Sequence, residues 1–423
     1  MDGTTIAQEV LAYLAVEGIE LSEDIGKAEA VLQAQVRRIG ARALELHLQG
    51  RKLGYEGSSR ACSCKQNQRF VGHRSKTVAT LLGPVILQRA YYHCSDCGAS
   101  SLPYDERVGL GGGEVSPGLA KAATLLAVQA PFESASRMLH NLTGQSLSPK
   151  TVERLTHQVG SVASSHEEAL AQKMERWESP AAEVQPERLY VAVDGAMVHE
   201  RDGWHEVKTA VCYWEDETGE RQARYGVRFE EAASFVAFVW SLACRCGLNV
   251  AKEVVLLGDG ARWIWDRIGG LLPEATQIVD WYHAMEHVWD CGRGLYGEGS
   301  EQTTAWVKQI ETLLWDGHVR EILRQLESQR CQARAPAQRQ ALDGLVTYLR
   351  NQDDRLAYAR FRARGLDIGS GRVEAACKNV VGARMKRSGM RWTRHGAQTT
   401  LSLRVFWLNG TWDALWSSHP LAA

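Results

Sequence analysis

Two aspartates stand at places where a folded chain can bring carboxylates together. Asp194 lies inside the apolar run VAVDGAM, and Asp259 directly follows the apolar run VVLL. Runs this short predict buried strands rather than helices. Because Gly258 and Gly260 flank Asp259, a ligand can approach the backbone at the strand tip, where α/β sheets place their chemistry. Asp259 is therefore a candidate metal ligand, and its alternative role is the N-cap of a helix over residues 261–272.

A third carboxylate is expected from a helix that packs on the same edge, and Glu374 in GSGRVEAACKNVVGARMKRSGMRW is the best candidate. Buried like charges repel unless a cation lies between them, so the three acids predict a divalent metal. The segment around Glu374 is rich in basic residues, namely Arg372, Lys378, Arg384, Lys386, Arg387, Arg391 and Arg394. A metal-binding carboxylate inside a basic segment is suited to phosphodiester chemistry on DNA.

A second possible metal site is formed by two short cysteine pairs. Cys62 and Cys64 precede Cys94 and Cys97, and the β-branched and aromatic residues around Gly83-Pro84 predict a hairpin between the pairs. This is the sequence form of a zinc ribbon, because four thiolates satisfy tetrahedral Zn²⁺ and the metal replaces a missing core. The alternative is four unrelated buried thiols, since the C-x-C spacing of the first pair is unusual. Nearby basic residues predict either DNA-backbone contacts or an ordinary solvated face, and they are Lys65, Arg69, His73, Arg74, Lys76 and Arg89.

The elements that must position these groups follow in order. Residues 1–55 have the helical spacing of an amphipathic lead-in, and residues 56–115 hold the zinc-ribbon-like part with a Gly-rich linker from residue 99. Residues 116–180 predict three helices, the third capped by Ser148 with Pro149 next to it. A short helix, a glycine-containing turn and a capped helix fit a helix-turn-helix, with Lys150 and Arg154 facing DNA, although many three-helix units bind no DNA.

From residue 181 the periodicity changes to that of a mixed sheet. Three strands, a helix, then strands alternating with helices are predicted over residues 181–290, which is the order of a ribonuclease H-like α/β fold. The first and fourth strands are neighbours in that fold, so Asp194 and Asp259 should lie side by side. Residues 291–366 have the composition of a helical insertion, and residues 367–423 complete the core with the basic C-terminal segment.

Several stretches carry a family resemblance. GDGARWIW, IVDWYHAMEH, SGRVEAACKNVVGARMKRSGMRW, AYYHCSDCG and the upstream cysteine pair resemble bacterial insertion-sequence transposases of the ISKra type, within the DDE superfamily. The resemblance covers most of the chain from about residue 60 to 410. It implies a ribonuclease H-like catalytic core with the triad Asp194, Asp259 and Glu374, and a helical insertion in the long interval between the last two acids.

The resemblance also implies a mechanism. DDE carboxylates hold two Mg²⁺ (or Mn²⁺) ions, one activating water or a DNA 3′-hydroxyl and the other stabilising the leaving oxygen. Asp280-Trp281-Tyr282-His283 is similar to the Cys/Asp-x-x-His element of Mutator-like relatives, which would place His283 near the scissile phosphate; the alternative is a solvated or capping histidine. His283-Ala-Met-Glu286-His287 also matches the H-x-x-E-H of inverted zinc peptidases, but that interpretation leaves Asp194 and the cysteines without a role.

DNA contacts are divided among the basic segments. Arg372 and Lys378 would hold the backbone near Glu374, Lys386 and Arg387 would contact phosphates, and Lys150 or Arg154 would read the end sequence. Trp392 would stack on an unpaired base or, equally, pack in the core. The expected partners are terminal repeats and target DNA, with at least a dimer to pair two ends. The alternative function is a catalytically inactive or nuclease-only DNA-binding protein derived from a transposase.

The bulk composition bounds these hypotheses. At 423 residues, with 44% hydrophobic and 23% charged residues, two or three globular domains are expected. The net charge of −1 does not decide for or against nucleic acid, because the basic residues are clustered. With no apolar run near 18 residues and no basic-apolar start, a cytoplasmic, nucleoid-associated bacterial protein is expected. In that compartment the ten cysteines predict thiols or metal ligands rather than disulfides.

Overall fold

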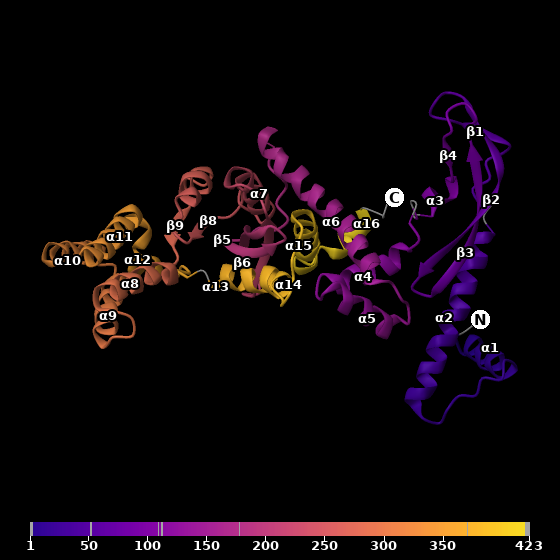
Figure 1. The fold of residues 1–423 in the computed structure, drawn as a ribbon, viewed down its shortest axis with the longest axis horizontal. Helices are drawn as coiled ribbons and strands as arrows, with labels where there is room; N and C mark the ends of the chain where they lie inside the picture. The colour runs from indigo at the N-terminus through magenta and orange to yellow at the C-terminus, as the bar shows by residue number, and fades with distance from the viewer. Residues whose placement is uncertain are drawn as a thin grey trace. The chain divides into compact units, whose positions relative to one another are not determined.

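The computed structural model describes residues 3–50, 53–108, 110, 113–176, 178–369 and 371–418. The chain divides into two compact units, which are described one at a time (Figure 1). Unit 1 comprises residues 1–155 together with 416–423, and unit 2 comprises residues 156–415. No helix of the described residues combines the length and the apolar character needed to cross a membrane.

Unit 1 begins with the expected helical lead-in. Helix α1 spans Gly3–Val16 and α2 spans Ile25–Gln49, and the Asp24 side chain caps α2 by accepting from the backbone N–H of Lys27 at 2.9 Å. One face of α2 packs on the following sheet through Ala41, Leu44 and Leu48. The sheet therefore supplies the apolar surface that holds the long helix in place.

The predicted hairpin forms the centre of a four-stranded antiparallel sheet of order β1-β2-β3-β4. Its strands are β1 Ser59–Ala61, β2 Asn67–Thr80, β3 Gly83–His93 and β4 Ser100–Ser101. Gly83, which follows the two-residue turn, has φ +133°, a value that glycine adopts without strain. The Thr80 hydroxyl closes the turn by donating to the Gly83 carbonyl at 2.7 Å.

The predicted linker from residue 99 is wrong in part. Helix α3, Pro103–Arg107, lies inside it, and its Asp105 is buried against Arg89 at 2.5 Å and Lys76 at 3.7 Å. Because a buried ion pair is costly to break, this stretch belongs to the folded sheet domain, and Arg89 is a structural residue rather than a DNA contact. Residues 109, 111 and 112 of the predicted linker lie outside the described residues.

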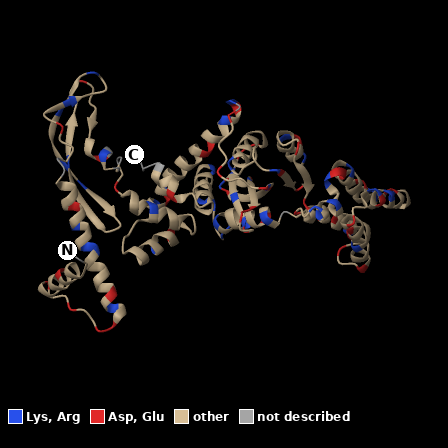
Figure 2. Cartoon of the chain, turned by 180° about the vertical axis from the view of Figure 1, so that it is seen from behind, with Lys and Arg blue, Asp and Glu red and all other residues tan. Residues whose placement is uncertain are grey.

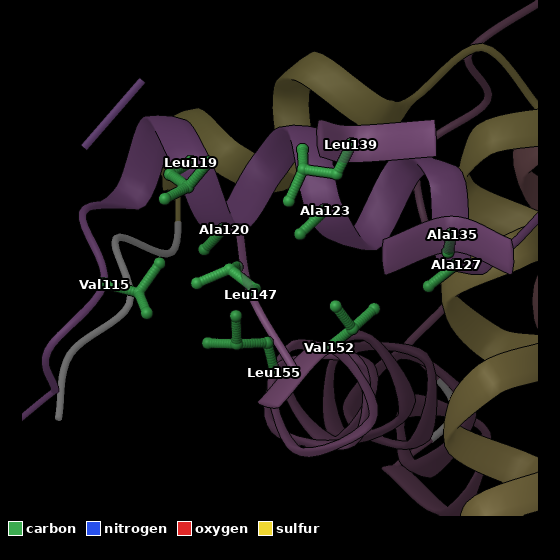
Figure 3. Packing of buried hydrophobic residues seen from close by; sticks show 10 residues of the cluster. All are labelled: Val115, Leu119, Ala120, Ala123, Ala127, Ala135, Leu139, Leu147, Val152 and Leu155. Atoms are coloured by element: carbon green, nitrogen blue, oxygen red, sulfur yellow. The ribbon is translucent and has the colours of Figure 1, made fainter. Parts of the chain in front are cut away.

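Three helices follow as predicted, α4 Pro117–Ala127, α5 Phe132–Thr143 and α6 Pro149–Ala171. Ser148 caps α6 by accepting from the N–H of Thr151 at 3.1 Å, and Gly144 ends α5 with φ +69°. Figure 3 shows the core between the helices, in which small alanines of α4 let larger side chains approach. Its buried members include Leu119, Ala120, Ala123, Leu139, Val152 and Leu155.

Unit 2 contains a five-stranded sheet of order β7-β6-β5-β8-β9. The strands are β5 Arg188–Glu200, β6 Gly203–Glu215, β7 Arg221–Arg228, β8 Glu253–Gly258 and β9 Thr276–Val279. Strand β6 pairs antiparallel with both β5 and β7, whereas β8 pairs parallel with both β5 and β9. The expected adjacency of the first and fourth strands of this sheet is therefore found.

The helices of unit 2 include the segment that was expected as an insertion. They are η1 Gln172–Arg176, α7 Ala232–Arg245, the π-helix η2 Ile264–Gly269, α8 Trp281–Tyr296, α9 Glu301–Trp315, α10 Val319–Gln332, α11 Pro336–Gln352, η3 Asp353–Leu356 and α12 Tyr358–Ala363. The last part of the chain adds α13 Gly371–Ala376, the π-helix η4 Cys377–Gly382, α14 Ala383–Met385, α15 Arg394–Leu408 and α16 Trp412–Ser418. Helices α8 to α11 pack on one another (Figure 1), so residues 291–366 are helical as expected.

Helix α15 covers the free edge of β7 with two side-chain amides. Asn409, its C-cap, accepts from the N–H of Tyr225 at 2.8 Å and donates to the carbonyl of Tyr225 at 2.9 Å. Gln398 accepts from the N–H of Phe229 at 2.9 Å and donates to the carbonyl of Val227 at 3.1 Å. These bonds replace the missing neighbouring strand, so the edge of the sheet is satisfied without a sixth strand.

Candidate functional site

Asp194 and Asp259 occupy equivalent places on neighbouring strands. In the parallel pair of β5 and β8, Ala192 lies opposite Leu257, and each aspartate follows its paired residue by two positions. Side chains two positions apart on a strand point to the same face. The sheet thus brings together two carboxylates that are far apart in the sequence.

The carboxyl of Asp194 is half-buried and held by two donors. Its Oδ1 accepts from the N–H of Gly195 at 2.7 Å, and its Oδ2 lies 3.5 Å from the Sγ of Cys377. Burial is the main reason that the pKa of Asp194 is raised, and the negative charge of Asp259 raises it further. A carboxylate that resists ionisation in this way gains from a bound cation.

Asp259 lies in a turn before the helix and is not its N-cap, since the helix begins at Arg262. Its Oδ1 accepts from the N–H of Ala261 at 2.7 Å, which closes an Asx turn. Gly260 has φ +99°, and a Cβ there would lie 3.2 Å from the ring of Tyr348. The side chain of Gln352 donates to the Gly260 carbonyl at 2.9 Å. The loop that carries Asp259 is therefore fixed by the end of α11.

Helix α8 begins at a buried aspartate that caps it. Asp280 accepts from the N–H of His283 at 2.8 Å and is fully buried. The Nδ1 of His283 lies 3.2 Å from Glu286 on the next turn. His283 itself is half-buried, one turn into the helix from Asp280. It lies close enough to Asp194 to lower the pKa of that carboxyl electrostatically.

Glu374 reaches the same neighbourhood from the end of the helical insertion. The N–H of Trp281 donates to the carbonyl of Ile368 at 2.9 Å, which ties the segment before α13 to the start of α8. Glu374 is exposed and pairs with Lys378 at 2.6 Å, which lowers its pKa, and His283 contributes to the same lowering. His283 therefore acts electrostatically on both Asp194 and Glu374.

The three predicted acids are not drawn into a closed metal site. Among the described residues, two groups of ligand side chains have their donor atoms within 4.8 Å of one another, and the three acids are not one of them. One group is the four cysteines, and the other is Glu200, Asp202 and His205 at the β5–β6 turn. The donor set of the acids still fits Mg²⁺ or Mn²⁺, which prefer oxygen ligands.

The zinc-peptidase interpretation of the sequence HAMEH finds no support in this geometry. Among the described residues, the ligand atoms of His283, Glu286 and His287 do not gather within metal-binding distance. The ring of His287 instead lies 3.9 Å from that of Tyr348. Two imidazoles that share one zinc ion must converge, and these do not.

Two π-helices directly follow the candidate acids. Helix η2 starts five residues after Asp259, and η4 starts three residues after Glu374. The helix expected over 261–272 is thus present, but over Ile264–Gly269 its backbone bonds span five residues instead of four. Single π-turns inside helices are rare and are concentrated at functional sites, so both segments support the assignment of this region.

The four cysteines converge at the end of the unit 1 sheet. The Sγ atoms of Cys62 and Cys97 lie 3.6 Å apart, and those of Cys64 and Cys94 lie 3.7 Å apart. A tetrahedral site with Zn–S bonds of about 2.3 Å has sulfur–sulfur edges of about 3.8 Å, so both distances fit zinc. The pKa of the Cys62 thiol is lowered to about 6, chiefly by the backbone N–H of Cys64, whereas the pKa of Cys64 is raised to about 12 by the neighbouring thiols, so the cluster favours one thiolate in the absence of a metal.

Tight turns on both sides shape the cysteine cluster. The N–H of Cys62 donates to Gln66 at 2.8 Å, and the N–H of Cys94 donates to Ala99 at 2.9 Å. Lys65 and Gly98 have φ of +70° and +74° at the tips of these turns. The unusual C-x-C spacing is therefore accommodated by a left-handed residue directly after the pair.

The basic segment after Glu374 divides into exposed and buried residues. Lys386, Arg387 and Arg391 are exposed, and Arg394 pairs with Glu200 at 2.7 Å. Two predictions of DNA contact are wrong here. Arg384 is fully buried beside the Trp392 ring, and the indole N–H of Trp392 donates to the carbonyl of Met385 at 3.2 Å. Of the two roles expected for Trp392, packing in the core is the one observed.

The remaining predicted contacts lie at surfaces or beside aromatic rings. Lys150 and Arg154 are exposed in the first turns of α6. The guanidinium of Arg372 lies 5.0 Å from the ring centroid of Tyr213, and Lys378 is engaged with Glu374. Arg372 is thus positioned by stacking, whereas Lys378 must leave Glu374 to contact a phosphate.

Sequence reasoning missed three residues of the site. Cys377 was recoverable, because three residues along a helix from Glu374 place it on the same face. Tyr348 and Gln352 were not, because no local pattern shows that the end of α11 meets the loop at Gly260.

Comparison with known proteins gives the family. The family model described as "Uncharacterised protein family (UPF0236)" matches residues 25–416. A protein of Streptococcus gallolyticus named "UPF0236 protein in vanSb 3'region" is 23% identical over 368 residues, covering 82% of this chain and 76% of that protein. The match to the family model includes the cysteine cluster, both aspartates and Glu374. The chain therefore belongs to the UPF0236 family.

Proposed function

We propose that this protein is a DNA transposase that cuts and joins the ends of an insertion sequence in a metal-dependent reaction. The observation that carries the proposal is the placement of Asp194 and Asp259 at equivalent positions of neighbouring parallel strands, with Glu374 and His283 in electrostatic contact. Paired carboxylates of this kind suit phosphodiester chemistry. The ISKra-type resemblance of the sequence agrees with this function.

The strand order supports a ribonuclease H-like core. Three antiparallel strands and two parallel strands give the sheet order β7-β6-β5-β8-β9. In the chain, α7 lies between β7 and β8. The helical insertion separates β9 and α8 from α13, which carries Glu374. In this proposal residues 181–290 and 367–423 form one catalytic core.

The acids would hold two Mg²⁺ or Mn²⁺ ions, which would activate the attacking water or 3′-hydroxyl and stabilise the leaving oxygen. The chain's own residues prepare the ligands. Gly195 and Cys377 orient Asp194, and Ala261 orients Asp259. Glu374 must exchange Lys378 for the metal, and Lys378 then becomes available to a phosphate.

Zinc is proposed for the cysteine cluster, where it would stabilise the small sheet of unit 1. Duplex DNA is the proposed partner. Lys150 and Arg154 would contact the terminal repeats, and Lys386, Arg387 and Arg391 would contact phosphates. Pairing two ends requires at least two copies of the chain, and the reaction would take place at the bacterial nucleoid.

One observation favours a second candidate function. Because the acids do not form a closed group, the protein could instead bind DNA without cutting it. A third possibility is a nuclease that cuts DNA without transferring the strand. The DNA products distinguish these functions, since only a transposase joins the cut end to a new strand.

The test uses full-length protein, Mg²⁺, and DNA that carries the sequences flanking the coding region in its source. Wild-type protein should cleave and join these ends. Asp194→Asn, Asp259→Asn and Glu374→Gln should each abolish cleavage and keep DNA binding. Glu298→Gln, at an exposed acid between α8 and α9, is the control and should remain active. Cleavage by Asp259→Asn, or no cleavage by wild type, would reject the proposal.

A further inference from the structure

A cavity of about 560 Å³ opens between strand β9 and the end of the helical insertion. Four arginines line it, namely Arg350, Arg355, Arg360 and Arg364. Thr276 and Gln277 of β9 form the opposite wall, and Asp353 and Asp354 are exposed at its rim. We call this cavity the arginine groove.

The positive charge of the arginine groove is local. Along α10, basic and acidic residues alternate, as in Arg320, Glu321, Arg324 and Glu327. Figure 2 shows the same mixture of blue and red over the helices of the insertion. The groove differs from that mixture in how its charges are paired: four arginines line it with Asp353 and Asp354, and two of the four, Arg350 and Arg364, form ion pairs with Glu327 and Glu253. An arginine that lines a cavity without a carboxylate partner is suited to bind an anion.

Arg355 is fixed in place by neutral acceptors. Its Nε donates to Gln277 at 2.8 Å, and its Nη1 donates to the side chain of Gln352 at 3.1 Å and to the carbonyl of Asn351 at 3.3 Å. The guanidinium lies 4.7 Å from the ring centroid of Trp265. Since these hydrogen bonds go to uncharged oxygens, they orient the guanidinium without cancelling its charge.

The other arginines differ in how much charge remains for a ligand. Arg350 pairs with Glu327, and Arg364 pairs with Glu253. Arg360 is exposed, and its guanidinium lies 5.3 Å from the Phe361 ring centroid. Arg355 and Arg360 are therefore the cations that an incoming anion would meet.

The arginine groove adjoins the loop that carries Asp259. Gln352, which is 5% exposed, donates to the carbonyl of Gly260 at 2.9 Å and accepts from Arg355 at 3.1 Å. One buried amide thus links the residue after Asp259 to the fixed cation of the groove. A chain of phosphates bound near Asp259 can continue into the groove.

We propose that the arginine groove binds the phosphodiester backbone of a nucleic-acid strand that passes Asp259, with Arg355 and Arg360 contacting successive phosphates. The identity of the polymer as DNA rests on the proposed function. Arg360 can offer a phosphate two parallel N–H donors, which lysine cannot. Arg355, whose Nε and Nη1 are engaged, would contact a phosphate through Nη2. The helical insertion then has a defined role in holding the strand that leaves the acids.

The experiment measures binding of fluorescein-labelled oligonucleotides to full-length protein by anisotropy, over a series of NaCl concentrations and without divalent metal. The groove variant is Arg355→Gln with Arg360→Gln. The matched control is Arg320→Gln with Arg324→Gln, which removes two exposed arginines from α10 of the same insertion. Each lost phosphate contact should reduce the slope of log K against log salt by about 0.7 for single strands and about 0.9 for duplex.

The groove variant should therefore lose about 1.4 in slope with a single-stranded oligonucleotide, and the control should match wild type. Because Arg355 also supports Gln352, Arg360→Gln alone is tested as well and should lose about 0.7. An unchanged slope for Arg360→Gln, or an equal loss in the control, would overturn the inference. Inorganic phosphate at constant ionic strength should bind without displacing the oligonucleotide; full displacement would assign the groove to free phosphate.

The transposase proposal and the groove inference can be rejected independently of each other. Binding in this assay requires neither metal nor cleavage. If wild type cuts no DNA while the groove variant still loses slope, the transposase proposal falls and the groove remains. If the acids are needed for cleavage while the groove variant keeps its slope, the groove inference falls.

Discussion

The Sγ of Cys377 lies 3.5 Å from the Oδ2 of Asp194, so a thiol from the C-terminal part of the core contacts a candidate catalytic carboxylate on β5. Burial raises the pKa of Cys377 to about 12, which keeps the thiol protonated and able to donate at neutral pH. Burial also raises the pKa of Asp194, and the Cys377 donor opposes that rise. Under the proposed function, the pair would set the lowest pH at which Asp194 can bind a metal.

Replacing Cys377 with an apolar side chain should change the pH dependence of DNA cleavage. In Cys377→Val the donor is lost, so the pKa of Asp194 rises and the acidic limb of the rate profile moves to higher pH. Cys377→Ser keeps a donor and should resemble wild type. The measurement is kcat/KM between pH 5 and pH 9. A Val variant with the wild-type profile would show that the thiol does not control Asp194.

Asp194→Asn should stabilise the fold at neutral pH. The pKa of Asp194 is raised by folding, so its contribution to stability is complete below its unfolded pKa of about 3.9 and is lost as pH rises through the folded value. Because the asparagine side chain does not ionise, the variant does not lose this stability as the pH rises. Urea unfolding should give a higher midpoint for the variant at pH 7, with the gain disappearing near pH 3. A gain of the same size at both pH values would point to packing instead.

The cysteine cluster should contain about one zinc ion per chain. Replacing Cys94 and Cys97 together with serine should remove the metal and unfold the small sheet of unit 1, because two thiolates cannot complete a tetrahedral site. Cys331→Ser, at an exposed cysteine outside the cluster, is the control. Metal analysis by mass spectrometry and proteolysis of the 59–101 region are the measurements. A zinc-free wild-type protein with an intact sheet would contradict the prediction.

The buried ion pair between Arg228 and Glu167 should be sensitive to the loss of either partner. The two side chains are 3.1 Å apart, and Arg228 is 1% exposed. Burial raises the pKa of Glu167 to about 7, so the carboxylate is largely ionised only above neutral pH. Arg228→Met should cost about 3–5 kcal/mol at pH 8 by leaving this charge unpaired.

At pH 5 the same change should cost less, because Glu167 is then protonated in the folded state. Arg267→Met, at an exposed position, should cost under about 0.5 kcal/mol at both values. Denaturant titrations of the two variants make the comparison. An equal loss from Arg228→Met at pH 5 and pH 8 would rule out an electrostatic origin.

Trp392→Ala should destabilise the core by about 3–5 kcal/mol, since the indole is buried and hydrogen-bonded to Met385. Trp392→Phe should cost less and retain DNA binding. Trp204→Ala removes a tryptophan that is 60% exposed and should leave stability within about 0.5 kcal/mol of wild type. If Trp392→Ala weakens DNA binding while the unfolding midpoint stays unchanged, the side chain would be a DNA contact after all.

Strand positions were predictable because apolar runs and turn residues are local signals. The runs around Asp194 and Asp259 predicted β5 and β8, and the β-branched and aromatic residues around Gly83-Pro84 predicted a hairpin that the structure contains. Burial of charged residues was not predictable. Arg384 and Trp392 stand in a segment whose composition resembles a DNA-binding surface, yet both face inward.

The candidate site was predictable only as far as neighbouring strands fix it. Asp194 and Asp259 are set by one strand pairing, whereas Glu374 depends on how the segment before α13 meets α8. The contact between Gln352 and Gly260 joins residues on different elements, and no spacing in the chain encodes it. Tertiary packing decides such contacts, and a single sequence does not display it.

The amides of Gln398 and Asn409 that cover β7 have a consequence for synthesis of the protein. All five strands of the sheet leave the ribosome before these residues do, so the nascent chain exposes the edge of β7 while the rest is being made. At about 5–20 residues per second, this interval lasts roughly ten to forty seconds. During that time the uncovered edge can pair with another chain, so we expect fragments that end before Gln398 to aggregate more readily than the complete chain.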